Sequence, residues 1–215
     1  MQISKKTFSL DCRKCPRLAS FLAQVREDCP DYYARPVPSF GDLNARVLIV
    51  GLAPGMHGAN RTGRPFTGDH AGVLLYQTIY DLGFSTHPVS ESESDGLQLK
   101  DCRITNAVRC LPPQNKPIGS EVNNCNPFLL EELEQMPKQG IIIALGSVAH
   151  TAVLKALKLK QSLYPFGHES IHQLNPELRM IDSYHCSRYN TQTRRLTHEM
   201  FRSVFVRARE LLDQE

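Results

Sequence analysis

Four of the seven cysteines stand in two groups that could bind a metal. The odd cysteine count argues against a disulfide framework. Four thiolates suit either tetrahedral zinc or an iron–sulfur cluster, and the spacing matches neither compact zinc ribbons nor ferredoxins. The four are Cys12, Cys15, Cys110 and Cys125. Cys29 and Cys102 are spare candidates for the same site, and with Cys186 they are otherwise expected to be buried free thiols.

A glycine-rich stretch at residues 51–72 could bring backbone N–H groups close to a ligand. It is not a phosphate-binding loop, because Gly63 is followed by Arg64 and Pro65 instead of Lys and Ser or Thr. No dinucleotide-binding GxGxxG follows the preceding apolar run either. The stretch therefore indicates a site for a ligand other than a nucleotide, or a structural loop.

Residues 168–172 read HESIH and match the HExxH motif of zinc proteases. In that motif two histidines one helical turn apart bind the metal, and the glutamate activates water. Gly167 and Pro176 leave room for about two helical turns, and no obvious third ligand stands downstream. We therefore expect a hydrogen-bonded structural pair of histidines here and not a protease site.

The elements that must position these residues are short apolar runs alternating with helical patterns. This alternation is typical of a parallel sheet with helices on both faces. The expected strands are 46–50, 102–107, 141–145 and 178–183, and the expected helices are 71–82, 147–157 and 193–212. Residues 88–100 are rich in Ser, Glu and Asp and predict an exposed loop.

Ligands of such sheets bind beyond the carboxyl ends of the strands. Unusual residues follow all four predicted strands, at 51–55, 106, 146–147 and 185–190. We expect the chemistry of the protein at this edge of the sheet.

Length and composition indicate a globular protein. The chain has 215 residues, 41% of them hydrophobic, and can bury roughly 70% of its unfolded surface, so we expect residues 1–215 to form a single domain. Its apolar runs are far shorter than the roughly 20 residues that cross a bilayer, and the first 12 residues contain no signal-peptide core. We therefore expect a soluble, cytoplasmic protein that does not bind membranes.

The net charge of +3 is weak evidence for a polyanionic partner, but the basic residues cluster. Six arginines lie between residues 185 and 209, against one acidic residue, Glu199. Taken alone, these charges are better explained as solvated helix faces.

Three longer motifs carry a resemblance to a known family. They read GLAPGMHGANRTGRPFTGD at 51–69, ITNAVRCLPPQNKP at 104–117 and SYHCSRYNTQTRRLT at 183–197. Together with the four cysteines, they closely resemble the family 5 (B-type) uracil-DNA glycosylases over nearly the whole chain. The resemblance implies a three-layer α/β/α fold with a short, mainly parallel four-stranded central sheet. It also implies a [4Fe–4S] cluster on the four cysteines and excision of uracil from DNA.

Glycosidic cleavage creates a uracil anion and an oxocarbenium-like sugar, after the base has been extruded from the DNA stack. His185 is suited to donate a hydrogen bond to uracil O2 as charge develops there. Asn106 can offer a donor and an acceptor to the pyrimidine edge, and Phe66 can stack on the extruded ring. Each also has a plainer explanation: a core histidine, an asparagine that closes a turn, and a core phenylalanine.

Asp69 is the nearest carboxylate in the first motif. Other branches of the superfamily carry Asp, Asn or Glu soon after the glycine that here is Gly51, but residues 52–54 of this chain are apolar. Asp69 could orient water or oppose the cationic sugar, and its position before a predicted helix also suits a capping residue. The residues expected to contact the base or the water are Gly51, Ala53, His57 and Asn60.

DNA binding would give the C-terminal arginines a role. Arg188, Arg194 and Arg195 are expected to reach phosphates around the extruded nucleotide. Arg188 and Tyr189 could fill the gap that the base leaves in the duplex, and Asn190 belongs to the same loop.

The expected function is that of a monomeric, monofunctional DNA repair glycosylase, which leaves an abasic site for base excision repair of nucleoid DNA. No lyase step is expected, because the motifs contain no lysine except Lys116. The apolar pocket end suggests further substrates such as hypoxanthine and oxidised or alkylated pyrimidines. The alternative is a non-catalytic iron–sulfur nucleic-acid-binding protein of the same fold.

Overall fold

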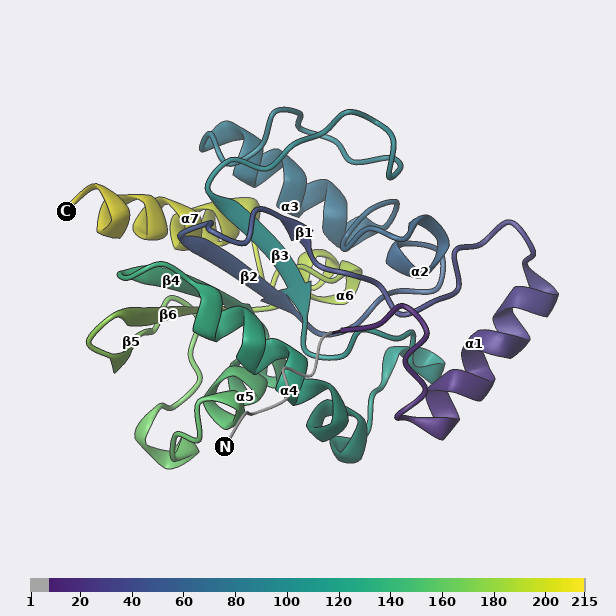
Figure 1. The fold of residues 1–215 in the computed structure, drawn as a ribbon. Helices are drawn as coiled ribbons and strands as arrows, with labels where there is room; N and C mark the ends of the chain where they lie inside the picture. Colours follow the sequence, from purple (N-terminus) through teal and green to yellow (C-terminus); the bar gives the residue numbers. More distant parts are fainter. Residues whose placement is uncertain (1–7, 215) are drawn as a thin grey trace.

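The computed structural model describes residues 8–214, which are built around one mixed sheet (Figure 1). Six strands lie in the order β1-β3-β2-β4-β6-β5. The inner strands run parallel, and they are β3 (Cys102–Asn106), β2 (Val47–Gly51), β4 (Gly140–Leu145) and β6 (Leu178–Ser183). These are the predicted strands to within one residue at each end, so the parallel core of the sheet is confirmed.

The expected count of four strands is wrong, because two edge strands extend the sheet. β1 (Phe40–Gly41) and β5 (Ile171–Asn175) pair antiparallel with β3 and β6. β1 is too short to show a pattern. In β5, Ile171 is exposed while the polar His172 is largely buried, which reverses the apolar-inward alternation of a typical strand.

Alternate residues of the parallel strands face two apolar cores, one on each side of the sheet. Val47 and Ile49 pack on one side against α3 and α7, and Leu48 and Val50 pack on the other against α4 and α5. The four helices are α3 (His70–Asp81), α4 (Gly119–Gln135), α5 (Ser147–Ala156) and α7 (His198–Asp213). Figure 1 shows the two pairs on opposite faces, which confirms the three-layer α/β/α fold.

A third apolar cluster joins α1 (Pro16–Asp28) to the side of this sandwich. The helix is drawn in purple in Figure 1. It is not among the helices predicted from the sequence. Cys15 stands at its N-cap and provides no side-chain hydrogen bond, so the usual start signal is missing. α1 packs near Phe128 of α4, and Arg17 forms an ion pair of 2.7 Å with Glu121.

The predicted helix 193–212 begins too early. Arg194 has a left-handed φ of 56°, and the Thr197 hydroxyl accepts a hydrogen bond from Met200 N (3.2 Å) as the N-cap of α7. A separate short helix, α6 (Arg188–Gln192), precedes this break and carries part of the arginine-rich motif. Helices α3 and α5 agree with the predictions to within one residue at each end.

Residues 88–100 form a loop, as predicted, but the loop is tied down instead of simply exposed. Arg64, only 5% exposed, forms an ion pair of 2.7 Å with Asp95 and donates a hydrogen bond to the Ser90 hydroxyl (3.0 Å). Ser90 is itself buried and bonds Thr67. The loop is therefore fixed against the glycine-rich segment.

Three short helical segments complete the described chain. They are α2 (Ala59–Thr62), η1 (Pro113–Asn115) and η2 (Gln161–Leu163). Within residues 8–214, no helix combines the length and the apolar character needed to cross a membrane.

Candidate active site

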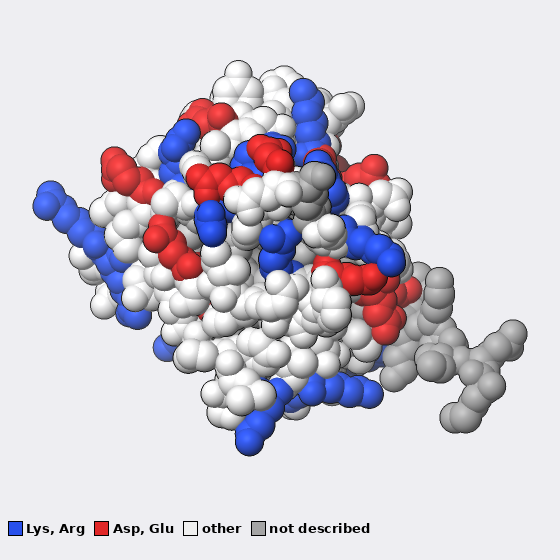
Figure 2. Space-filling model, turned by 90° about the vertical axis from the view of Figure 1, so that its left-hand side faces the viewer, with Lys and Arg blue, Asp and Glu red and all other residues white. Residues whose placement is uncertain are grey.

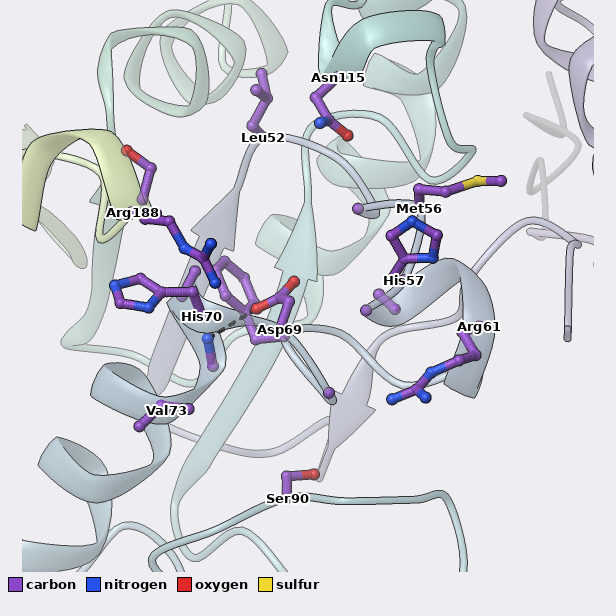
Figure 3. A pocket seen from close by; sticks show the side chains of 18 of the residues that line it. Leu52, Met56, His57, Arg61, Asp69, His70, Val73, Ser90, Asn115 and Arg188 are labelled. Carbon is purple, nitrogen blue, oxygen red and sulfur yellow. Dashed lines mark hydrogen bonds between the residues drawn. The ribbon is translucent and has the colours of Figure 1, made fainter.

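The carboxyl ends of the parallel strands open into a cavity of about 1040 Å³ (Figure 3). Its walls come from the loop after β2, the start of α3, the end of β3 and the segment after β6. The structure brings many of the predicted site residues to this cavity: Ala53, His57, Phe66, Asp69, Asn106, His185 and Arg188.

Asp69 stands at the N-terminus of α3, with its two carboxylate oxygens in different surroundings. Oδ1 accepts a hydrogen bond from Gly72 N (2.8 Å), shown dashed in Figure 3, and so caps the helix. Oδ2 faces Gly55 and Gly58 in the cavity wall, since a Cβ added to Gly55 would lie 3.5 Å from it. Burial raises the pKa of Asp69, while the N–H groups of Gly72 and Ala71 act in the opposite direction. The same carboxylate can therefore cap the helix and serve the cavity.

The side chains of Phe66 and Asn106 lie directly against the backbone of Gly51. A Cβ at Gly51 would lie 2.6 Å from the Phe66 ring, so glycine is required for this approach. Gly51 does not line the cavity itself and acts by making room for the other two side chains. Asn106 is 6% exposed, and its Oδ1 is buried with no hydrogen-bond partner in the described part of the chain. A buried acceptor without a partner costs about 1–3 kcal/mol, so this oxygen is available to a ligand N–H.

His185 follows β6 and lines the same cavity as Asp69. Its ring stacks near that of Phe66, with the centroids 6.3 Å apart and the planes inclined by 30°. Burial lowers the pKa of His185 to about 4, so its imidazole is neutral at pH 7. Behind it lies Gly146, where an added Cβ would come within 3.4 Å of the His185 Cβ.

Helix α6 supplies both a cavity residue and a support for His185. The Arg188 side chain projects into the cavity (Figure 3). Tyr189 is 70% exposed and free to meet a large partner. Asn190 Nδ2 instead donates a hydrogen bond to the His185 carbonyl oxygen (2.8 Å), so this predicted DNA-contact residue has an internal role.

The C-terminal arginines after Arg188 do not line the cavity, although Arg61 of α2 does. Arg194 borders a neighbouring groove, and the Arg195 guanidinium lies 4.9 Å from the centre of the Tyr184 ring. Figure 2 views the molecule from the side where α7 ends and shows acidic and basic residues interspersed. On α7, Arg207 forms an ion pair of 2.9 Å with Glu210.

Two predicted base contacts are placed differently from each other. His57 is at the cavity wall, with its Nδ1 2.7 Å from the Tyr32 hydroxyl. Asn60 is fully buried and does not line the cavity, and its amide atoms have no hydrogen-bond partner within residues 8–214. Asn60 in this structure is therefore an interior residue without contact to the cavity.

Sequence reasoning missed some of the cavity wall. Asn115 reaches it from the cysteine-bearing loop with a left-handed φ of 57°, and Ser90 reaches it from the tethered loop (Figure 3). Asn115 lies within the quoted motif at 104–117, whose predicted roles rest on Asn106 and Cys110 and leave Asn115 without one. Ser90 has no local signal, because its place depends on the distant Arg64.

Residues 38–209, most of this sandwich and its cavity, match the family model of the uracil DNA glycosylase superfamily. The chain belongs to this superfamily. It is 45% identical over 205 residues to a type-5 uracil-DNA glycosylase of Thermus thermophilus, covering 93% of each chain. It is 43% identical to a type-5 uracil-DNA glycosylase of Pyrobaculum aerophilum, covering 93% of this chain and 88% of the relative. It is 41% identical to one of Mycobacterium leprae, covering 93% and 91%.

This uracil-DNA glycosylase superfamily member gathers its four candidate metal-binding cysteines in the third apolar cluster. Cys15, Cys110 and Cys125 are buried, and Cys12 packs beside them. Burial raises the pKa of the Cys125 thiol to about 11, and the neighbouring cysteines raise it further, whereas the Arg109 backbone N–H opposes the shift. Burial also raises the pKa of Cys110, with contributions from the other three cysteines. The four thiols therefore lie close enough to affect one another's ionisation.

The spacing of these thiols tests which metal group fits them. A zinc ion with Zn–S bonds of about 2.3 Å would bring its sulfurs to about 3.8 Å from one another. Within residues 8–214, the only three ligand-type side chains whose donor atoms all lie within 4.8 Å of one another are His150, His172 and Asp182. No three of the four cysteine sulfurs are that close. The cysteines are therefore not gathered in this structure as a single zinc ion would require.

The HESIH segment is not a helix and its histidines do not pair. Residues 168–170 form a turn, and His172 lies in β5. His168 Nδ1 accepts a hydrogen bond from Tyr184 N (3.2 Å), while His172 Nε2 is 3.0 Å from Asp182 Oδ2. As expected, the two histidines are hydrogen-bonded within the fold and are not arranged as a protease site, and each has its own partner.

Proposed function

We propose that this protein is a uracil-DNA glycosylase, which hydrolyses the N-glycosidic bond of deoxyuridine in DNA and leaves an abasic site. The observation that carries the proposal is a single cavity shared by Asn106, Phe66, His185 and Asp69. The similarity to named type-5 uracil-DNA glycosylases over 93% of the chain supports the same activity.

Asn106 is suited to select uracil. Its buried Oδ1 lacks a partner in the described chain and can accept a hydrogen bond from uracil N3–H, while Nδ2 can donate to uracil O4. Cytosine offers an acceptor at N3 and an amino group at C4, which reverses both requirements. Phe66 provides an aromatic face on which the extruded base can stack.

His185 is suited to stabilise the leaving base. Because its pKa is about 4, it is neutral at pH 7 and keeps one ring N–H that can donate to uracil O2. The charge on O2 grows as the glycosidic bond breaks, so this hydrogen bond strengthens in the transition state.

Asp69 is suited to hold the attacking water and to oppose the cationic sugar. Its Oδ2 faces the cavity, and its Oδ1 is fixed by Gly72 N, so the carboxylate is oriented before the substrate arrives. The raised pKa favours proton acceptance from water as the new C–O bond forms. Water then supplies the hydroxyl of the abasic sugar and the proton that the uracil anion requires.

The reaction ends at the abasic site, because a lyase step requires an amine that forms a Schiff base. None of the described residues that line the cavity is a lysine. Arg188 and Tyr189 are placed to contact DNA around the extruded nucleotide, with Arg188 in the cavity and Tyr189 exposed beside it. Arg194 and Arg195 lie farther along the same segment and can contact flanking phosphates.

The proposal includes a [4Fe–4S] cluster on Cys12, Cys15, Cys110 and Cys125, because four thiols, the donor set that such clusters take, are gathered in one largely buried group. When bound, the cluster would supply a structural link between α1 and the loop that carries Asn115. Thiolate ligands require a reducing environment, which supports a cytoplasmic location. We also propose a monomer that forms a single domain over residues 1–215, and the one six-stranded sheet of residues 8–214 supports the single domain.

Release of free base from DNA tests the proposal. Duplexes that differ only in one central base, uracil, cytosine, thymine or hypoxanthine, are incubated with the iron-loaded protein, and the released base is quantified by mass spectrometry. We expect release of uracil and none of cytosine or thymine, and release of hypoxanthine if the apolar pocket end widens the range. Stoichiometric duplex binding without release of any base would favour the non-catalytic iron–sulfur binding protein.

A further inference from the structure

The HESIH segment has no role in the proposed chemistry. Four of its residues form hydrogen bonds with residues at the end of β6 and just after it. His172 Nε2 lies 3.0 Å from Asp182 Oδ2, and Glu169 N donates to the Asp182 carbonyl oxygen (2.8 Å). Asp182 N donates to the Ser170 carbonyl oxygen (3.0 Å), and Tyr184 N donates to His168 Nδ1 (3.2 Å). The segment therefore fixes the residues that come directly before His185.

Asp182 is the centre of this attachment. Its side chain is fully buried, and it contacts His150 Nδ1 (2.8 Å), His172 Nε2 (3.0 Å) and Gly167 N (3.3 Å). A buried carboxylate is stable only when several donors surround it. The contacts join three elements, because His150 lies in the first turn of α5, His172 in β5 and Asp182 in β6.

Proton placement shows that hydrogen bonds alone can hold this network together. The Tyr164 carbonyl oxygen only accepts, so His150 Nε2, at 2.9 Å, must carry a hydrogen. The contact between His150 Nδ1 and Asp182 Oδ1 then needs one further proton, which either atom can carry. The three donor groups are also close enough to share a metal ion, which makes metal content a necessary control.

His185 depends on such support because its ring, which stacks near Phe66, makes no hydrogen bond within the described chain. Within residues 8–214 no group hydrogen-bonds its imidazole, and burial is the only cause of its lowered pKa. Its position is set by its backbone, through Asn190 Nδ2 on its carbonyl (2.8 Å) and Gly146 N on the Ser183 carbonyl (2.8 Å). A displacement of residues 182–184 would therefore be passed on to the ring.

We propose that the buried network of Asp182, His150 and His172, together with His168, is a positioning device that aims His185 into the base cavity. The inference rests on the proposed function, in which His185 contacts uracil. These residues act through His185 and do not touch the substrate, since none of them lines the cavity.

A double-mutant cycle on the iron-loaded protein tests the device. The rate constant for uracil excision under single-turnover conditions is measured for His172→Ala, for His172→Gln, and for the matched control Gln173→Ala, a neighbour in β5 that is exposed. Each is made with His185 intact and in a His185→Ala background. Binding of the uracil duplex and the melting temperature are measured in parallel.

With His185 intact, we expect His172→Ala to lower the rate constant by about 10- to 100-fold, because a shift of about 1 Å in a reacting group can cost about 100-fold. DNA binding should change less than threefold. His172→Gln, which keeps a donor toward Asp182, should recover most of the rate, and Gln173→Ala should match the wild type. In the His185→Ala background, His172→Ala should have no further effect. An equal loss in both backgrounds, or no loss in either, would overturn the proposal.

A second readout separates this inference from the proposed activity. Nitrogen-15 NMR signals of the His185 imidazole should shift in His172→Ala and stay in place in Gln173→Ala, whether or not the wild type excises uracil. Unmoved His185 signals would refute the positioning role. Inactive wild-type protein with shifted signals would refute only the uracil activity. One equivalent of zinc or another divalent metal that is lost in His172→Ala would show a metal site and overturn the hydrogen-bonded network.

Discussion

Asp69 performs two tasks with two oxygens, and substitutions can separate them. Asn caps helices about as well as Asp, so Asp69→Asn keeps the hydrogen bond to Gly72 N and removes the carboxylate that faces the cavity. Asp69→Ala removes both. Loss of the cap costs about 1 kcal/mol, which lowers the melting temperature by about 2–4 °C for a chain of this size. Loss of the positioned base lowers the excision rate by about 10²- to 10⁴-fold.

We therefore expect both variants to lose the same large factor in single-turnover excision, while only Asp69→Ala loses stability. Burial raises the pKa of Asp69 and so disfavours its charged form, and Asp69→Asn should melt at or above the wild-type temperature at pH 7. Differential scanning fluorimetry and excision from a uracil duplex measure the two effects on the same preparations. An Asn variant that excises within tenfold of the wild type would refute the catalytic role. An Asn variant that melts as low as the Ala variant would refute the capping role.

Three further predictions concern the same carboxylate and the cysteines. Gly58→Ala should slow excision, because the added Cβ would lie within 2.8 Å of the Asp69 carboxyl carbon. Gly55→Ala should change the rate little, because its Cβ would lie 3.5 Å from Asp69 Oδ2. Single-turnover assays of both variants test this pair of predictions. In a profile of excision rate against pH, the rate should fall on the acid side at a pH above the ordinary aspartate pKa of 3.8, because burial raises the pKa of Asp69 and its protonated form is inactive. If Asp69→Asn shows the same fall, another group is responsible for it. Cys125→Ser should lose bound iron and the brown colour, whereas Cys186→Ser, a buried thiol outside the cysteine cluster, should keep both when iron is assayed.

The parallel core of the fold was predictable because its strands are buried on both faces. Continuous apolar runs such as 47–50 and 141–145 arise only when two helical layers cover a sheet, and this constraint is visible in the sequence itself. β5 was harder to predict, because only Leu174 packs into the apolar core, while the other inward side chain, His172, is polar and is held by Asp182 on β6. α1 was missed because Cys15 provides no capping side chain at its start, although Pro16 at its first position is a typical helix-start residue.

The residues of the candidate site also divide into those that local sequence predicts and those placed by distant contacts. Asp69, Asn106 and His185 were found because each follows or precedes a predictable element, and the strand ends meet at one edge of the sheet. Ser90 could not be predicted from its neighbours in the sequence, because its loop is held at the cavity by an ion pair between Asp95 and the distant Arg64. Asn60 lies in the same motif, but its side chain is turned into the interior, and the sequence does not show that orientation.

The most direct test of the proposed activity follows one end-labelled duplex that contains a single uracil. It is incubated with excess wild-type or His185→Ala protein, and half of each sample is heated in alkali before electrophoresis. We expect the labelled strand to stay intact without alkali and to be cut at the uracil after alkali. We expect His185→Ala to lose this alkali-dependent cut. Strands that stay intact after alkali with iron-loaded wild-type protein would contradict the glycosylase, and strands cut before alkali would contradict a reaction that ends at the abasic site.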